Sequence, residues 1–396
     1  MTALDLTPAT ARALLGPFAG AGDDAAVVDR WATVVWCHLL EPGDSVAGRL
    51  IAGLGPSESL RLAVDDRTTA LITEAELATA RKRWMPRLSL DRIHDGLRSA
   101  AKAGVQLVTR GDPEWPDQVD DLGVHAPVCL WVRGAAGRLS GLRPSVAVVG
   151  ARAATSYGEH VAIELAADLA GSGIAVVSGG AYGIDGAAHR ATLSVGGMTV
   201  ALLAGGVDRA YPAGNAGLID RIAGSGVVVS EVPCGSAPTK WRFLQRNRLI
   251  AALADATVVV EAGWRSGSLN TAGHAAALSR PLGAVPGPIT SAASAGTHRL
   301  LREYGAHCIT SAADVREMIG LDGPATVGGV LDVRGRTDDT TRVRDALSAR
   351  AWRETDDVAR RAGMVPEEVE AILGLLNLEG SVTRGPGGWR HAGPRV

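Results

Sequence analysis

A basic segment at residues 239–254, TKWRFLQRNRLIAALA, carries the side chains best suited to a binding role. Four cations fall within nine residues, and no Asp or Glu occurs between Val232 and Ala254. Such a local charge favours a run of phosphates as the ligand. Trp241 and Phe243 lie among the cations, where an aromatic ring either stacks on a single-stranded base or packs into a core. The cations are Lys240, Arg242, Arg246 and Arg248.

Helix geometry limits how many of these cations can share one ligand. Residues turn by about 100° each on an ideal helix, so Arg246 and Arg248 would stand about 200° apart. We therefore expect Phe243 to Arg248 at the entry of a helix, after a loop closed by Pro238, so that cations and free backbone N–H groups converge on one phosphate. The turn Ser266-Gly267-Ser268 adds two hydroxyls and a backbone that a ligand can approach closely.

Short apolar runs alternate with helical segments between Val146 and about Ile309. Continuous apolar strands separated by helices indicate a doubly wound parallel sheet covered on both faces, an α/β fold. Ligands of such sheets bind at the carboxyl ends of the strands. Three polar or glycine-rich segments follow expected strands, at Gly150-Ala-Arg152, at Ser178-Gly-Gly-Ala-Tyr-Gly183 and at Gly263-Trp-Arg-Ser-Gly-Ser268. The expected strands are 146–149, 175–177, 200–203, 227–229, 257–260 and 282–285.

The chain of 396 residues divides into four expected regions. A glycine-rich turn at 41–55 in the helical first region resembles a helix-hairpin-helix, whose turn can hold a DNA phosphate, although most such turns only connect helices. The last region predicts helices at 341–349, at 356–362 with Thr355 as its cap and at 366–378, then a β-ribbon, which together describe a winged helix. The regions are a helical domain at 1–104, the α/β domain at 105–320, a linker at 321–340 and the winged helix at 341–396.

Composition excludes several classes of protein. A formal charge of −2 excludes a globally basic protein, so a nucleic-acid site must be a local patch. Four cysteines without CxxC spacing predict a reducing compartment, with neither a disulfide framework nor a zinc site. No apolar run approaches the roughly 20 residues of a membrane span, and the N-terminus lacks a signal-peptide pattern. We expect a cytoplasmic protein without a cofactor or a membrane partner.

Two classes of enzyme that have a doubly wound sheet are alternatives for this chain. A dinucleotide site is disfavoured because Arg152 replaces a glycine of the fingerprint and Ser178 stands where a ribose-binding acid belongs. A nucleotide-processing hydrolase is the alternative, since acid–base candidates lie near strand ends, although the same residues suit helix caps and first turns. ATP hydrolysis has no P-loop behind it. The candidates are Asp185, His189, Asp208 and Glu261.

An ordered series of motifs resembles the DNA-processing protein DprA (Smf) family over about residues 105–310. The resemblance implies an extended Rossmann-like domain that binds single-stranded DNA, forms a homodimer and loads RecA recombinase on incoming DNA in natural transformation. It implies no catalytic activity. The motifs are VAVVGAR at 146–152, VSGGAYGIDGAAHR at 177–190, DRAYP at 208–212, FLQRNRLIA at 243–251, EAGWRSGS at 261–268 and VPG at 285–287.

Motif position also implies which residues contact DNA, namely Arg152, Ser178, Gly179, Arg246, Asn247 and Arg248. Lys240 joins them for its charge, and Ser266, Gly267 and Ser268 for their fit to phosphate oxygens. Cations cannot act as bases near neutral pH, so this set suits holding a DNA backbone rather than cutting it. The chain departs from the family pattern at Ala151, at Tyr182, where a cation is missing, and at Asn270 and His274.

The second helix of the winged-helix region carries Glu367, Glu368 and Glu370 and no Lys or Arg. An acidic recognition helix is repelled by duplex DNA, so we expect this region to contact protein. A duplex-DNA repressor, the third class considered, would need a preferred operator. The sequence therefore predicts a single-strand-binding recombination mediator, with the nucleotide-processing hydrolase as the alternative.

Overall fold

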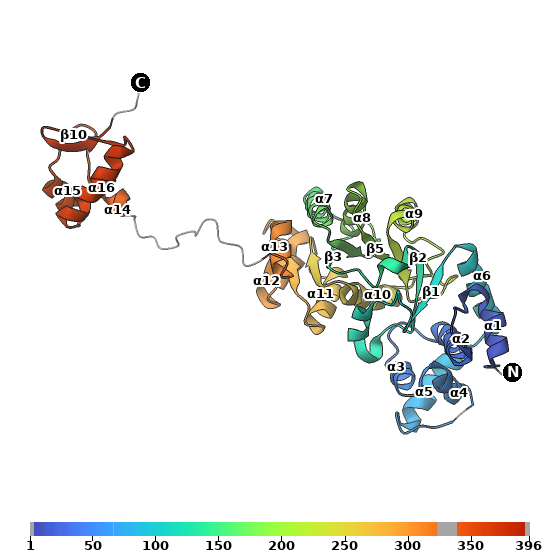
Figure 1. Cartoon of the computed structure of the whole chain (residues 1–396). Coiled ribbons are helices and arrows are strands. Elements are labelled where there is room, and N and C mark those ends of the chain that lie inside the picture. The colour runs from blue at the N-terminus through green and yellow to red at the C-terminus, as the bar shows by residue number, and fades with distance from the viewer. Residues whose placement is uncertain (1–3, 66, 323–338, 393–396) are drawn as a thin grey trace. The chain divides into compact units, whose positions relative to one another are not determined.

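The structure, a computed structural model, describes residues 4–65, 67–322 and 339–392 and divides into two compact units (Figure 1). The first unit spans residues 1–324 and the second 325–396. Most of the predicted linker at 321–340 lies outside the described residues. In the part of the chain that is described, no helix is both long and apolar enough to cross a membrane.

A sheet of nine strands, counted over the described residues, forms the centre of the first unit in the order β1-β2-β6-β5-β4-β3-β7-β8-β9. The strands from β6 to β9 in this order pair in parallel, and β1 and β2 extend the sheet as antiparallel strands. The strands are β1 Gln106–Thr109, β2 Cys129–Gly134, β3 Ser145–Val149, β4 Ala175–Ser178, β5 Thr199–Leu202, β6 Val227–Ser230, β7 Ala256–Val259, β8 Leu282–Ala284 and β9 His307–Cys308.

Helices cover both faces of this sheet, which explains why its strands are apolar at nearly every position. Val146 and Val148 of β3 pack with one helical layer, and the alternate residues Ala147 and Val149 pack with the other. The first layer contains α7 Ser156–Gly171 and α8 Ile184–Ser194; the second contains α10 Lys240–Leu253 and α11 Ser268–Ala277. On the first side α9 Ala216–Ser225 follows α8 (Figure 1). The predicted doubly wound α/β fold is confirmed.

Six N-terminal α-helices, counted within the described residues, share an apolar core with the β1–β2–β6 end of the sheet. Trp31 and Trp36 of α2 belong to the same core as Trp131 of β2 and Val228 of β6. All six lie within residues 1–104, the region predicted to be helical. The helices are α1 Pro8–Leu15, α2 Asp24–Leu39, α3 Ser45–Leu54, α4 Pro56–Val64, α5 Glu74–Trp84 and α6 Leu90–Lys102.

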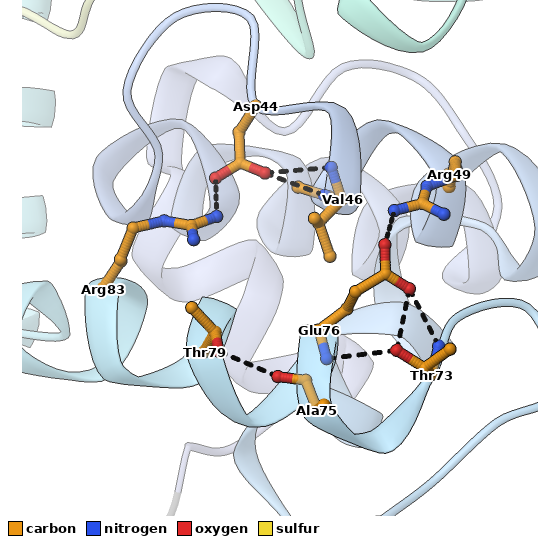
Figure 2. A network of polar contacts seen from close by, with 9 residues as sticks. Asp44, Val46, Arg49, Thr73, Ala75, Glu76, Thr79 and Arg83 are labelled. Carbon is orange, nitrogen blue, oxygen red and sulfur yellow. Dashed lines mark hydrogen bonds and ion pairs between the residues drawn. The ribbon is translucent and has the colours of Figure 1, made fainter.

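Polar contacts fix α3 against α5 (Figure 2). Asp44 caps α3 by accepting from the N–H groups of its first turn, and its second oxygen lies 3.1 Å from a guanidinium nitrogen of Arg83. Thr73 and Glu76 form a capping box at the start of α5. A hydrogen bond from Arg49, and then those from Thr73, lower the pKa of Glu76 to about 2. Two ion pairs, Arg83 with Asp44 and Arg49 with Glu76, thus join α3 and its N-cap to α5.

The second unit contains α14 Asp339–Asp345, α15 Thr355–Ala362 and α16 Pro366–Leu378, followed by the antiparallel ribbon β10 Val382–Gly385 and β11 Gly388–His391. Val343, Val358, Leu373 and Trp389 belong to its core. The winged-helix arrangement is confirmed. Two details of the prediction are wrong: α14 ends at Asp345 rather than 349, and Thr355 is the first helical residue, because Glu354 takes the extended backbone of the N-cap.

Candidate nucleic-acid interface

Helix α10 begins at Lys240, so the four cations of the basic segment occupy its first nine residues, and the expected helix entry at Phe243 is wrong. Thr239 is the N-cap, and its hydroxyl accepts from the N–H of Arg242 at 3.2 Å. A threonine directly after a proline is a favourable helix start, which moves the helix forward by a turn. Arg246 and Arg248 therefore lie in mid-helix, where their N–H groups are already used, and they point to different sides.

Arg246 lies under the carboxyl ends of β4 and β5 and is only 6% exposed. Its Nη1 donates to the carbonyl oxygens of Gly179 at 2.6 Å and Leu202 at 2.5 Å. Burial lowers the pKa of its guanidinium to about 10; nearby Asp185 acts to raise it, and Arg152 lowers it further. The side chain thus remains a cation at neutral pH, although its hydrogen-bond partners are neutral carbonyls.

The ring of Phe243 lies near both this buried cation and an exposed one, Arg152. The guanidinium carbon of Arg152 lies 4.8 Å from the centroid of the Phe243 ring, and that of Arg246 lies 6.0 Å away. The ring of Tyr211, which is 48% exposed, is 5.5 Å from the same ring. We call Arg152, Tyr211, Phe243 and Arg246 the edge cluster. Phe243 is half-buried outside the apolar cores, and Trp241 is 55% exposed, so both rings are on or near the surface.

Asp185 fills the backbone N–H groups that the carboxyl edge would otherwise offer to an anion. It is 6% exposed, and its Oδ2 accepts from the N–H of Gly179 at 3.1 Å. Burial raises the pKa of this carboxyl, while the charge of Arg246 and hydrogen bonds from the N–H groups of Ala181, Gly179 and Gly150 act to lower it. The carbonyl of Gly179 accepts from Arg246 and its N–H donates to Asp185, so both backbone groups of Gly179 already have a partner within the protein.

Two other predicted side chains are turned inward. Ser178 is fully buried, and its hydroxyl donates to the carbonyl of Val148 at 2.6 Å. His189 is fully buried with Nδ1 at 2.7 Å from the hydroxyl of Thr199. Burial, and then the charges of Arg246 and Arg190, lower the pKa of His189 to about 3. Ser178 and His189 therefore hold strands and helices together below the surface.

Glu261, the acid after β7, anchors the loop that carries Arg152. Its Oε2 accepts from the N–H of Thr155 and its Oε1 from the hydroxyl of Thr155, each at 2.8 Å. Thr155 is the N-cap of α7, and a Cβ at Gly158 would lie 2.6 Å from Glu261 Oε2. The carboxylate thus fixes the start of α7. Asp208, the fourth acid–base candidate, likewise accepts from the backbone, at the N–H of Gly235.

Two other arginines of α10, Arg248 and Arg242, are neutralised by acids from other elements. Arg248 lies 2.5 Å from Glu231, with both side chains at least nine-tenths buried. Arg242 donates to both carboxylate oxygens of Glu41 at 2.9 Å. Burial raises the pKa of Glu41, but contacts with Arg242 and Arg87 outweigh it and hold the pKa below its usual value. The expectation that Arg248 joins Arg246 at one ligand is therefore wrong.

The glycine turn before α3 packs against Gln245 and Arg248 of α10 and does not project outward. A Cβ on Gly43 would lie 2.8 Å from Gln245 and 3.2 Å from Arg248, and its φ of +78° suits glycine alone. The carbonyl oxygen of Gly43 lies 2.9 Å from His125 Nδ1. The turn therefore contacts protein, unlike the phosphate-holding turn that its sequence resembles.

Asn247 connects α10 to the serine turn. Its Nδ2 donates to the carbonyl of Gly267 at 3.3 Å and to Oδ1 of Asn270 at 3.1 Å. The hydroxyls of Ser266 and Ser268 lie 2.7 Å apart. Lys240 is exposed on the first turn of α10. The departure at Asn270 thus provides a partner for Asn247.

Two features of the site were missed in the sequence. Tyr211 belongs to the DRAYP motif at 208–212, but nothing in its spacing indicated that its ring would contact Phe243. Tyr182, 48% exposed, replaces the missing cation with a phenol whose oxygen accepts from the N–H of Gly214 at 3.2 Å. The exposed tyrosines at the carboxyl edge were the available signal, because surface aromatic residues in a ligand-binding region suit stacking.

Fold and site define an α/β protein with a cation–aromatic surface at the carboxyl edge of a doubly wound sheet, joined to a winged helix. The profile described as DNA recombination-mediator protein A matches residues 106–320, and the profile described as DprA winged helix domain matches residues 332–388. The chain belongs to the DNA recombination-mediator protein A (DprA/Smf) family.

Relatives cover most of the chain. It is 44% identical over 374 residues to the putative DNA processing protein DprA of Mycobacterium tuberculosis (strain ATCC 25618 / H37Rv), covering 90% of this chain and 93% of that relative. It is 33% identical over 263 residues to DNA processing protein DprA of Bacillus subtilis (strain 168), covering 66% and 86%. The X-ray structure of DprA from Streptococcus pneumoniae matches with a TM-score of 0.59 and 31% identity, over 73% of this chain and 96% of that one.

Proposed function

We propose that this chain binds single-stranded DNA at the carboxyl edge of its sheet and acts as a non-catalytic recombination mediator. In this proposal it is a cytoplasmic homodimer that loads RecA recombinase on incoming DNA during natural transformation. The observation that carries the proposal is the edge cluster, in which the guanidinium carbons of exposed Arg152 and buried Arg246 lie 4.8 and 6.0 Å from the centroid of the Phe243 ring. Membership of a family described as recombination mediators supports the same role.

The chemistry of the edge cluster favours an unpaired strand over a duplex. Arg152 and Arg246 supply charge for phosphates, while Phe243 and Tyr211 supply ring faces for bases. Rings can stack only on bases that are not already stacked within a duplex, and such stacking tolerates every base. We include Lys240 in the path because its charge is exposed on the first turn of α10, and the Ser266-Gly267-Ser268 turn because Asn247, the neighbour of Arg246, donates to it. Asn247 positions that turn, and Ser178 and Gly179 shape the floor beneath Arg246.

Internal contacts weaken the case for a nucleotide-processing hydrolase. Asp185 occupies backbone N–H groups, His189 is buried with a pKa near 3, and Glu261 has both oxygens on Thr155. A general acid or base must reach the reacting atoms. These contacts support a binding role, and we expect no base release from nucleoside monophosphates.

The winged helix is proposed to contact protein. Glu367, Glu368 and Glu370 are exposed at the start of α16, and Leu375 and Leu378 further along it are 62% and 85% exposed. Acidic groups repel phosphates, whereas exposed leucines are typical of protein contacts.

The test is fluorescence anisotropy with labelled single-stranded and duplex oligonucleotides of equal length at several salt concentrations. We expect single-strand preference, and we expect Arg152→Ala to weaken binding and to reduce the slope of log K against log salt by about 0.7, the value for one lost phosphate contact. The matched control is Arg242→Gln, which removes a cation of the same helix that is already paired with Glu41. Equal binding of duplex, or an unchanged slope with Arg152→Ala, would contradict the proposal.

A further inference from the structure

A second cation–aromatic cluster lies on the same sheet edge, outside the residues assigned so far. Trp264 follows β7 and is 58% exposed. The guanidinium carbon of Arg299, from α12 Ala295–Glu303, lies 5.1 Å from the Trp264 ring centroid and 5.5 Å from that of Tyr304. Tyr304 is 48% exposed. Both rings thus contact one arginine and keep about half of their surface open to solvent.

Close backbone packing fixes the position of this cluster. The N–H of Gly296 donates to the carbonyl of Ala262 at 2.7 Å, and a Cβ on Gly296 would lie 2.7 Å from the carbonyl oxygens of Ala262 and Gly263. Only glycine allows α12 to approach the loop after β7 so closely. The Arg299 side chain on the next turn of α12 therefore reaches the indole of Trp264.

The guanidinium of Arg299 is itself oriented by two partners. Its Nε donates to Glu303 at 2.8 Å and its Nη2 to the hydroxyl of Tyr304 at 3.2 Å. The hydrogen bond with Glu303, followed by Tyr304, raises the pKa of Arg299 above its usual value. The charge nearest the indole is thus permanent, and its plane is fixed for stacking on Trp264.

The cluster is bordered by further cations and leaves the sheet next to the loop that bears Arg152. Arg265 and Arg302 are exposed beside Trp264 and on α12, while the acid of α12, Glu303, is paired with Arg299. Strands β3 and β7 are parallel neighbours, so the loops bearing Arg152 and Trp264 leave the sheet about 5 Å apart. One extended strand can therefore pass both.

We propose that Trp264, Arg299 and Tyr304 form a second stacking station for single-stranded nucleic acid, in which an unpaired base stacks on the open face of the indole. Arg265 and Arg302 then contact the adjoining phosphates. The station takes bases without sequence preference, because every base has a stacking face. This inference rests on the proposed function, since it extends the path of the same strand.

Oligonucleotides of different length distinguish binding at the edge cluster alone from binding at the edge cluster and the second stacking station together. We would measure anisotropy with labelled oligothymidines of about 4 and about 12 nucleotides, lengths at the lower and upper part of known single-strand site sizes. Trp264→Ala is expected to weaken binding of the longer strand by roughly 5- to 150-fold, the range for losing one stacked base, and to leave the shorter strand nearly unchanged. Trp264→Phe keeps a ring and should recover most of the loss.

The matched control is Ile163→Ala, which removes a similarly exposed apolar side chain (45%) from α7. It should change neither affinity. Quenching of tryptophan fluorescence by the longer strand should fall in Trp264→Ala, and the quenching that remains should come from Trp241, which is 55% exposed.

Two results would overturn the inference alone. The first is that the wild type binds both lengths through Arg152 and that Trp264→Ala binds each length with the same affinity as the wild type. The second is a Trp264→Ala protein with unchanged affinity and a smaller mass in sedimentation, which would make the cluster a contact between two copies of the chain. Failure of the proposed function looks different: the wild type would show no Arg152-dependent binding at either length, and the station would fall with it.

Discussion

Helix α10 carries two buried arginines two residues apart, and they meet opposite kinds of partner. Arg246 donates to neutral carbonyl oxygens under the sheet edge, whereas Arg248 is paired with the carboxylate of Glu231. The helical repeat alone sends them to different sides. One side of the helix keeps its positive charge for a ligand, and the other spends its charge on the fold. A basic run in a sequence is therefore not yet a basic surface.

The largest expected effect belongs to the neutral side. Arg248→Ala leaves Glu231 buried without its partner, which should lower the free energy of unfolding by about 3–5 kcal/mol. Replacing both residues, as Arg248→Met with Glu231→Leu, should recover most of that loss because no buried charge is left unpaired. Denaturant unfolding of the three proteins measures both effects. If Arg248→Ala lowered the affinity for DNA and left the stability unchanged, Arg248 would serve the ligand and not the fold, which contradicts this prediction.

Burial of the His189 imidazole, and then the nearby charge of Arg246, lower its pKa, so we expect a protonated His189 to destabilise the fold. Its folded-state pKa is about 3, below the ordinary value of 6.5, so between these values the unfolded chain binds more protons than the folded one. Stability from this group is therefore complete above pH 6.5 and falls as the pH drops, by up to about 2 kcal/mol at pH 5. The free energy of unfolding should decrease less between pH 7 and pH 5 in His189→Gln than in the wild type. Parallel slopes in the two proteins would mean that His189 is not held neutral.

The smallest effect separates stacking from charge within the edge cluster. Phe243→Leu keeps both arginines and removes the ring that both of them approach, so single-strand affinity should fall by about 1 kcal/mol, roughly fivefold. The salt dependence should stay as in the wild type, because no phosphate contact is lost. Arg152→Ala is the comparison, since it should change the salt slope. An altered slope in Phe243→Leu would mean that the ring acts mainly by holding the arginines in place.

Local patterns were enough to predict the parallel sheet and the winged helix. The β-branched runs around Val146 and Val177 mark strands, and Pro366 marks the start of α16. The start of α10 was misplaced because a single ligand for all its cations was assumed. The pairing of Arg242 with Glu41 joins residues 201 positions apart, and no local pattern encodes it. Tertiary packing alone decides which cations meet an acid.

The internal carboxylate of Asp185 also bears on selectivity among the ligands of a cell. It is tethered beside the N–H of Gly179 and so competes there at a high effective concentration, whatever the solution contains. A free mononucleotide gains little at this edge, because its phosphate would have to displace an anion that never diffuses away. A polymer that engages several side chains at once does not depend on that one position. We therefore expect free nucleotides to compete poorly with the single strand that is proposed to bind this edge.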